Sequence, residues 1–193
     1  MPRVPPKKLS HVVYRTHRYQ AMVRWYQAVF GARVKSASPT VTFMTFDDED
    51  HRLAIANLDA LRPEHREPDQ AGLVGLDHVA YTYEGLADLF ANYVYLRDLG
   101  IRPYWCIHHG DTVSMYYADP DGNQMEFQVE TFEAQRRAPP VTTSVPRKNN
   151  PIGVEYDPEA WLRALEAGTP EEELLVRKVH EPVSPIRGAM ARG

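Results

Sequence analysis

Two halves of this chain repeat one pattern of apolar and polar positions. Residues 9–14 read LSHVVY and residues 76–81 read LDHVAY, so the same strand-like segment recurs 67 residues later. After each segment, apolar residues recur at i, i+3, i+4 and i+7, the spacing of a helix with one buried face. Each stretch ends at a glycine, Gly31 or Gly100, a residue suited to a helix C-cap. The pattern therefore predicts a strand followed by an amphipathic helix, twice.

Three strand-like runs follow each predicted helix. The clearest of them cover residues 41–46 and 52–58 in the first half and residues 101–107, 112–117 and 124–129 in the second. The sequence DPDGN at 119–123 is a strong turn signal between the last two runs. The predicted order is βαβββ in each half, with modules at about 7–60 and 73–130 of one domain that spans residues 7–130.

One βαβββ module alone presents a curved sheet with bare edges and a single helix to cover it. Two modules that pair their sheets would enclose a central cleft, in which equivalent positions of the two halves face each other. We therefore expect an α+β fold with a cleft between the paired modules.

The composition changes after residue 130, and residues 131–193 are expected to form a C-terminal arm. The stretch from 136 to 151 is polar and contains several prolines, which indicates irregular structure. A short helix is predicted to start at Pro158, because Asp157 suits its N-cap and Gly168 follows its last turn. We expect the arm to cover the cleft or to contact a second copy of the chain, so a homo-oligomer is the expected assembly.

Composition narrows the class of protein. The 193 residues suit one domain, and 43% hydrophobic and 25% charged residues are ordinary for a soluble globular protein. A net charge of -4 gives no basic field for nucleic acid or an anionic membrane. The single cysteine, Cys106, excludes a disulfide within the chain, and neither a signal peptide nor an apolar run of about 20 residues is evident. The expected setting is cytoplasmic, with a small molecule as partner and no nucleic acid or membrane.

The repeat singles out two of the eight histidines. His11 and His78 hold the same position in the first strand of each module, so paired sheets would bring them together across the cleft. A single histidine in a strand is more often an ordinary core residue. Two histidines at repeat-related positions indicate a shared site.

Glu126 is the third member of this predicted site. It lies between Met125 and Phe127 in an otherwise apolar strand, where a buried carboxylate is costly unless it is paired or binds a metal ion. Two imidazoles and one carboxylate form the facial triad of non-haem iron(II) oxygenases, which leaves coordination positions open for substrate and dioxygen. The repeat places the first-module counterpart of Glu126 near Ile55, so no fourth ligand is expected there.

These residues carry a family resemblance. The βαβββ repeat, with His11 and His78 on first strands and Glu126 on the last, resembles the vicinal oxygen chelate (glyoxalase/bleomycin resistance/dioxygenase) superfamily. More closely it resembles the type I extradiol dioxygenases, in particular their small one-domain members that act on catechol or 2,3-dihydroxybiphenyl. The resemblance covers residues 8–130 and, weakly, residues 150–154.

The resemblance implies further site residues. The segment around His51 is similar to the one that carries the family's acid/base histidine. The segment from His108 to Tyr117 is similar to the one that carries a second-sphere histidine and a tyrosine. The nine-residue spacing of these two favours His108, with His109 as the other candidate. The family often has an asparagine two residues after that histidine, where this chain has Gly110.

The resemblance also implies the reaction. Iron(II), or alternatively manganese(II), would be held by His11, His78 and Glu126. The enzyme would open a catechol ring with dioxygen and release a hydroxymuconic semialdehyde-type product. His51 would move a substrate proton, while the second-sphere histidine and tyrosine would hydrogen-bond to the substrate oxygens.

Three alternatives stay open on the sequence alone. A glyoxalase-like isomerase or lyase on the same fold would use a fourth protein ligand, for which the chain offers no candidate. A metal-free binding protein of the bleomycin-resistance type would not need all three ligand positions filled. The last alternative is a structural or regulatory protein whose histidines belong to its core.

Overall fold

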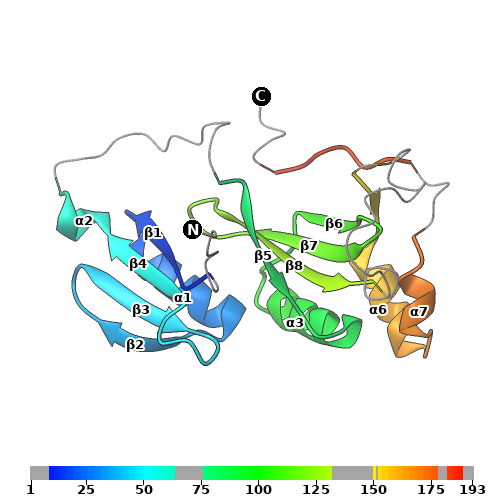
Figure 1. Cartoon of the computed structure of the whole chain (residues 1–193), viewed down its shortest axis with the longest axis horizontal. Helices are drawn as coiled ribbons and strands as arrows, with labels where there is room; N and C mark the ends of the chain where they lie inside the picture. Colours follow the sequence, from blue (N-terminus) through cyan, green and yellow to red (C-terminus); the bar gives the residue numbers. More distant parts are fainter. Residues whose placement is uncertain (1–8, 64–75, 132–149, 151, 178–181, 189–193) are drawn as a thin grey trace, which may run out of the picture. The chain divides into compact units, whose positions relative to one another are not determined.

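Both halves of the repeat form a mixed β-sheet with one main helix against it. The computed structural model describes residues 9–63, 76–131, 150, 152–177 and 182–188. These fall into two units (Figure 1): unit 1 holds residues 9–63 and 119–121, and unit 2 holds the other described residues. The βαβββ order predicted from the sequence is present in each half.

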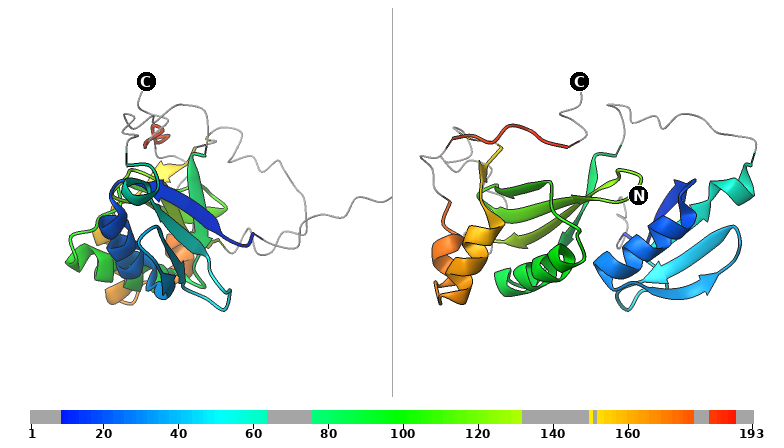
Figure 2. Two further views of the ribbon diagram at one scale, coloured as in Figure 1. Left: turned by 90° about the vertical axis from the view of Figure 1, so that its left-hand side faces the viewer. Right: turned by 180° about the vertical axis from the view of Figure 1, so that it is seen from behind.

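Unit 1 is built on a four-stranded sheet. Its elements are β1 (Val12–Thr16), α1 (Tyr19–Phe30), β2 (Arg33–Ala37), β3 (Val41–Thr45), β4 (Leu53–Asn57) and the short α2 (Leu58–Leu61). The strand order is β1-β4-β3-β2, with β1 parallel to β4 and the other pairs antiparallel. In the view from behind, α1 lies across one face of this sheet (Figure 2).

Helix α1 forms because its apolar side chains share one face. Met22, Tyr26 and Val29 follow one another at intervals of four and three residues, and all three are buried. The helix stops at Gly31, whose φ of 58° is a left-handed conformation that glycine adopts without strain. The predicted amphipathic helix and its glycine stop are confirmed.

Unit 2 repeats this plan with one additional strand. Its first elements are β5 (His78–Thr82), α3 (Leu86–Asp98), β6 (Trp105–His108), β7 (Thr112–Ala118), β8 (Gln124–Glu130) and β9 (Val154–Glu155). The strand order is β5-β8-β7-β6-β9, with β5 parallel to β8 and the other pairs antiparallel. The run predicted from Ile101 forms a strand only from Trp105, and Leu58, predicted to end a strand, begins α2.

The two faces of the unit 2 sheet differ in chemistry. The face toward α3 carries the apolar side chains that alternate along β7 and β8: Val113, Met115, Tyr117, Met125, Phe127 and Val129. Successive residues of a strand point to opposite faces, so the residues between them lie on the other side of the sheet. That second face therefore holds Ser114, Tyr116 and Glu126.

The C-terminal residues of unit 2 pack on the same module. Two short helices follow β9, α6 (Pro158–Glu166) and α7 (Glu171–Leu174). Helix α6 starts as predicted, with Asp157 accepting a hydrogen bond from the Glu159 amide at 3.0 Å. The Tyr93 hydroxyl of α3 donates to the Glu159 carboxylate at 2.7 Å, which attaches α6 to α3. Of the stretch from 136 to 151 that was predicted to be irregular, residues 136–149 and 151 lie outside the described residues.

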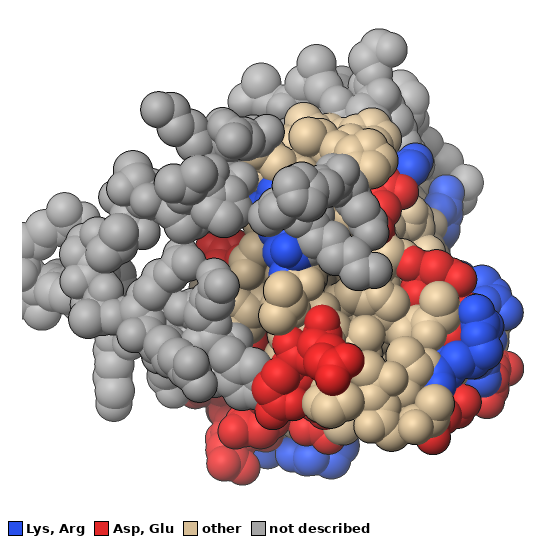
Figure 3. Space-filling model, turned by 90° about the vertical axis from the view of Figure 1, so that its right-hand side faces the viewer, with Lys and Arg blue, Asp and Glu red and all other residues tan. Residues whose placement is uncertain are grey.

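Charged side chains of both signs occur on the surface. In Figure 3, acidic and basic residues lie side by side on the part of this face that the structure describes. Ion pairs in unit 2 join charges of opposite sign, such as Arg97 with Asp98 at 3.1 Å and Arg187 with Glu155 at 2.7 Å. No helix in the described ranges is long and apolar enough to cross a bilayer.

Candidate active site

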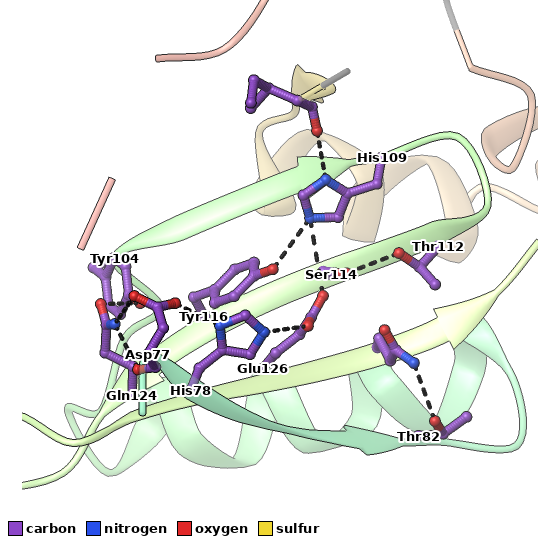
Figure 4. A network of polar contacts seen from close by, with 12 residues as sticks. Asp77, His78, Thr82, Tyr104, His109, Thr112, Ser114, Tyr116, Gln124 and Glu126 are labelled. Atoms are coloured by element: carbon purple, nitrogen blue, oxygen red, sulfur yellow. Dashed lines mark hydrogen bonds and ion pairs between the residues drawn. The ribbon is translucent and has the colours of Figure 1, made fainter. Parts of the chain in front are cut away.

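Two neighbouring strands of unit 2 bring His78 and Glu126 together. His78 begins β5, and Glu126 lies in β8 opposite Ala80, two residues after His78. Residues two apart on a strand share a face, so the His78 and Glu126 side chains point the same way. The Nε2 atom of His78 lies 3.1 Å from Oε2 of Glu126 (Figure 4). These two predicted metal ligands are therefore in contact.

A chain of hydrogen bonds supports the other nitrogen of the His78 ring. Nδ1 donates to Oδ2 of Asp77 at 2.6 Å, and Gln124 donates to the second oxygen of that carboxylate at 3.2 Å. The Tyr104 hydroxyl in turn donates to Oε1 of Gln124 at 2.8 Å. A carboxylate on one ring nitrogen fixes the tautomer and orients the second nitrogen toward a metal ion, as is usual around metal-ligating histidines. Sequence reasoning missed this supporting chain: Asp77 directly precedes His78, but Gln124 and Tyr104 come from distant positions in the sequence.

Glu126 is a buried carboxylate, with 6% of its surface exposed. Burial raises the pKa of its carboxyl group, but hydrogen bonds with His78, Ser114 and Tyr116 outweigh burial and bring this pKa below its usual value. The hydrogen bond with Glu126 is also the main cause that raises the pKa of His78 to about 9. Without a metal ion the two side chains form an ion pair at neutral pH. A metal ion that binds here must displace the ring proton.

Tyr116 and His109 complete the polar cluster on this face of the sheet. Tyr116 lies directly opposite Glu126 in the β7–β8 ladder, and its hydroxyl hydrogen-bonds to the carboxylate. Nε2 of His109 lies 3.2 Å from the Tyr116 hydroxyl and 3.9 Å from Oε1 of Glu126 (Figure 4). The cluster, which we call the unit 2 cluster, consists of His78, His109, Tyr116 and Glu126.

The expectation that Tyr117 faces the site is not met. In the ladder Tyr117 pairs with Met125, so it shares the face toward α3 and is only 1% exposed. Its hydroxyl lies 3.9 Å from Sδ of Met115. Strand alternation carried the missing signal, because apolar Met115 and Tyr117 bracket Tyr116 just as Met125 and Phe127 bracket Glu126.

The expectation for His108 is corrected in the same way. His108 is 3% exposed, and its Nε2 donates to the main-chain carbonyl of Leu175 at 3.0 Å. Its Nδ1 accepts a hydrogen bond from the Gly110 amide at 3.1 Å. Both ring nitrogens are thus engaged away from Glu126, and His109, the other candidate, is the histidine that reaches the unit 2 cluster.

Unit 1 brings the other two predicted site histidines together. His11 is exposed and lies immediately before β1 rather than within it. The centroid of its ring is 4.6 Å from that of His51. Nδ1 of His51 lies 3.0 Å from Oδ2 of Asp50, and the Phe43 ring meets the His51 ring edge-on at 4.9 Å. A predicted metal ligand and the predicted acid/base residue are therefore neighbours.

The complete three-residue ligand set stays a prediction. Two of its members, His78 and Glu126, lie in unit 2, whereas His11 lies in unit 1. Among the residues that the structure describes, no three His, Cys, Asp or Glu side chains form one group around a metal position. The observed part of the set is therefore the pair of donors in unit 2.

The unit 1 position equivalent to Glu126 holds no metal donor. By strand register this position is Ala54, which lies on β4 between β1 and β3 as Glu126 lies on β8 between β5 and β7. Ala54 is 2% exposed, and the adjacent Ile55 is fully buried. Neither side chain is a ligand, as the sequence repeat predicted for this position.

Aromatic side chains border the unit 2 cluster. The rings of Trp105 and Tyr116 lie 5.0 Å apart, and the Tyr104 ring is 6.1 Å from that of Tyr116. Ile107 and the partly buried Ile152 pack into the same group. An apolar wall beside a few convergent polar groups is typical of a small-molecule site, and aromatic walls suit ring-shaped ligands.

Comparison with known proteins gives relatives over most of the chain. Residues 8–127 match the Glyoxalase/Bleomycin resistance protein/Dioxygenase superfamily. Biphenyl-2,3-diol 1,2-dioxygenase 2 of Rhodococcus globerulus is 40% identical over 167 residues, which cover 86% of each chain. Biphenyl-2,3-diol 1,2-dioxygenase 3 of the same organism is 38% identical over 170 residues, which cover 88% of each chain.

Solved structures share the fold at low sequence identity. A glyoxalase/bleomycin resistance protein/dioxygenase from Nocardioides has a TM-score of 0.54 and 18% identity, covering 73% of this chain and 93% of its own. The fosfomycin resistance protein FosX from Listeria monocytogenes has a TM-score of 0.51 and 16% identity, covering 68% of this chain and 99% of its own. At these identities the likeness concerns the fold alone.

Proposed function

The chain belongs to the Glyoxalase/Bleomycin resistance protein/Dioxygenase superfamily and to its extradiol dioxygenases, and we propose that it uses iron(II) and dioxygen to open a catechol ring. The two relatives are named for biphenyl-2,3-diol, so a bicyclic catechol is the proposed substrate class. One observation carries the proposal: a buried Glu126 carboxylate contacts Nε2 of His78, whose Nδ1 is held by Asp77.

The donor chemistry of these residues fits iron(II). Two imidazoles and one carboxylate are the ligand set of non-haem iron(II) oxygenases, and we assign His11, His78 and Glu126 to it. Asp77 occupies Nδ1 of His78, so Nε2 is the proposed donor atom. When bound, iron(II) lowers the pKa of a coordinated phenol and supplies the electron transfer between the ring and dioxygen.

His51 is the proposed proton carrier of the reaction. It would accept a proton from the second hydroxyl of the catechol and return it later, a task suited to an imidazole, whose ring nitrogens can both accept and donate a proton. Its ring lies 4.6 Å from that of His11, while its Nδ1 contacts Asp50. Nε2 is therefore the atom proposed to exchange the proton.

His109 and Tyr116 are the proposed partners of the substrate oxygens, in the roles that the sequence suggested for His108 and Tyr117. Both polar groups border the Glu126 carboxylate, so they can hydrogen-bond to an oxygen placed beside it and stabilise charge that develops there. The aromatic wall around Trp105 would pack against the second ring of a bicyclic catechol.

Oxygen consumption and product colour test the proposal directly. The protein is purified anaerobically, loaded with iron(II), and mixed with 2,3-dihydroxybiphenyl or with catechol in oxygenated buffer. We expect uptake of one dioxygen per substrate, a yellow product, and both atoms of labelled dioxygen in that product. A faster reaction with 2,3-dihydroxybiphenyl than with catechol would support the bicyclic assignment.

The same measurements separate the alternatives. Iron bound at one per chain without oxygen uptake on any catechol would contradict the dioxygenase and favour an isomerase or lyase. No bound metal and no reaction would favour a binding protein. Equal rates with both substrates would remove the bicyclic assignment and leave the ring-cleavage reaction in place.

A further inference from the structure

Residues far along the chain hold His109 of the unit 2 cluster. Four of them form what we call the arm contact: Asn150, Ile152, Gly153 and Arg177. The main-chain carbonyl of Ile152 accepts a hydrogen bond from Nδ1 of the His109 ring. A carbonyl has no proton to donate, so Nδ1 must carry one, and in the neutral ring Nε2 then presents a lone pair. Nε2 lies 3.2 Å from the oxygen of the Tyr116 hydroxyl, whose single proton goes either to this nitrogen or to the Glu126 carboxylate.

The residues on either side of the Ile152 carbonyl are held by hydrogen bonds between Asn150 and Gly153. The Asn150 side chain donates to the Gly153 carbonyl at 2.9 Å and accepts from the Gly153 amide at 2.7 Å, and Asn150 is 6% exposed. Gly153 has a φ of 132°, and a Cβ at this position would lie 2.6 Å from the main-chain oxygen of His108. Only glycine permits this close approach, so the turn lies directly against β6 next to His109.

Arg177 ties the turn to the main chain of His109. Its Nη1 donates to the His109 carbonyl at 2.8 Å, and its Nη2 donates to the Asn150 carbonyl at 2.7 Å. One planar guanidinium thus spans both segments, a geometry that a lysine ammonium does not reproduce. The ring, the backbone and the supporting turn of His109 are therefore fixed together.

We propose that the arm contact is a positioning device that sets the tautomer and orientation of His109, so that Nε2 accepts a hydrogen bond from a substrate hydroxyl. The opposite tautomer would place two acceptors, Nδ1 and the Ile152 carbonyl, against each other and leave a hydrogen bond unmade. The substrate half of this proposal rests on the proposed function. The tautomer half does not, because every contact lies within unit 2.

Nitrogen NMR of the histidine rings tests the tautomer. The full-length chain is labelled with ¹⁵N-histidine and measured without metal, and a His109→Gln variant identifies the signals. We expect a protonated Nδ1 and an unprotonated Nε2 for His109 at a pH where the ring is neutral. In Asn150→Ala and in Arg177→Met the proton should distribute over both nitrogens. Arg163→Met is the matched control, since Arg163 is an exposed α6 residue remote from these contacts.

Kinetics of the iron-loaded chain test the consequence. We expect Asn150→Ala and Arg177→Met to retain iron and to lower kcat by about tenfold, which corresponds to about 1.4 kcal/mol. Either variant suffices if the other fails to fold. A protonated Nε2 in the wild-type chain, or an unchanged ring spectrum in both variants, would overturn the proposal. A chain with the expected tautomer but no dioxygenase activity would instead contradict the proposed function alone.

Discussion

Nε2 of His78 contacts Oε2 of Glu126 at 3.1 Å, although the strand register sets Gln124, not Glu126, opposite His78. This diagonal contact leaves the directly opposite position to Gln124, which reaches behind the imidazole to the Asp77 carboxylate. Glu126 therefore contacts Nε2 of the ring, and Gln124, two positions earlier in the same strand, supports Nδ1 through Asp77. Position 126 supplies the proposed metal ligand, and position 124 supports the carboxylate of Asp77.

Alanine at any proposed ligand should remove the metal. We expect His11→Ala, His78→Ala and Glu126→Ala each to lose bound iron and ring cleavage while remaining folded, because a three-ligand site has no spare donor. Iron per chain after anaerobic reconstitution and the circular dichroism spectrum are the measurements. His17→Ala is the control, since His17 pairs with Asp59 at 2.7 Å in unit 1. Full iron occupancy with full turnover in one of the three would remove that residue from the set.

Replacing His51 should separate catalysis from binding. His51→Phe is expected to retain iron and to bind catechol anaerobically, while kcat falls by about 10²- to 10⁴-fold, the usual contribution of a general acid–base residue. The pH profile of kcat should lose one limb. Loss of iron would make His51 a ligand, whereas normal turnover would make it an ordinary turn residue beside Asp50.

Adjacent tyrosines on β7 offer a matched pair of variants. Tyr116→Phe should lower kcat/KM by about tenfold or more, because a hydrogen bond to a charged group contributes about 1.5–3 kcal/mol. Tyr117→Phe should leave kcat/KM unchanged, since the Tyr117 hydroxyl lies on the opposite face beside Met115. Steady-state kinetics with 2,3-dihydroxybiphenyl distinguish the two. A larger loss of kcat/KM in Tyr117→Phe than in Tyr116→Phe would contradict the assignment of Tyr116 to the face of the sheet that binds the substrate.

The hydrogen bonds that support the His78 ring should raise the affinity of the site for iron(II). Gln124→Leu is expected to weaken iron binding by about 10- to 100-fold, the usual effect of losing an outer-shell hydrogen bond around a metal-ligating histidine. Gln128→Leu is the control on the same strand face, where Gln128 donates to Thr82 at 3.2 Å. Titration of the metal-free chain with iron(II) under anaerobic conditions gives both affinities. Equal affinities would mean that Gln124 does not act through Asp77.

The buried His108 should make stability depend on pH. Burial is the main cause that lowers the pKa of its ring below the ordinary value of 6.5. The unfolded chain therefore binds the proton more readily. The stabilising contribution of the neutral, buried His108 ring is complete above about pH 6.5. It is lost as the pH falls from there toward the pKa of the folded state.

Urea unfolding of metal-free wild type and His108→Asn between about pH 8 and about pH 5 tests this. The wild type should lose stability relative to the variant on acidification, by at most about 1.4 kcal/mol per pH unit. A constant difference between the two proteins across this range would contradict the assignment of the acid sensitivity to His108.

The repeat in the sequence was sufficient to predict the βαβββ modules, because helix and strand periodicity are local properties. It also selected His78, and the isolated carboxylate in an apolar strand selected Glu126; the structure places these two residues in contact. His108 and Tyr117, which the spacing of the family pattern favoured, do not lie on the face of Glu126, because that spacing carries no information on which face of a strand a side chain takes. Alternation alone assigns Tyr116 to the face of Glu126.

The support of His109 was not predictable from the sequence in the same way. Its ring contacts Ile152, 43 residues later, and its carbonyl contacts Arg177, 68 residues later. No periodicity links these positions, because a main-chain carbonyl acts as the partner and any residue type supplies one. Such contacts emerge only when the segment after β8 has been placed on the sheet.

Strand β9 also determines whether the edge of the unit 2 sheet exposes unpaired backbone groups to other molecules. Without it, β6 would present unpaired amides and carbonyls, a template onto which a strand of another chain can add. The pairs Ile107–Glu155 and His108–Val154 occupy that template with a strand only two residues long. Glu155 and its ion-pair partner Arg187 place charge on the new border. The segment that orients His109 therefore also covers the edge of β6. A strand from another copy of the chain cannot add there and start an aggregate.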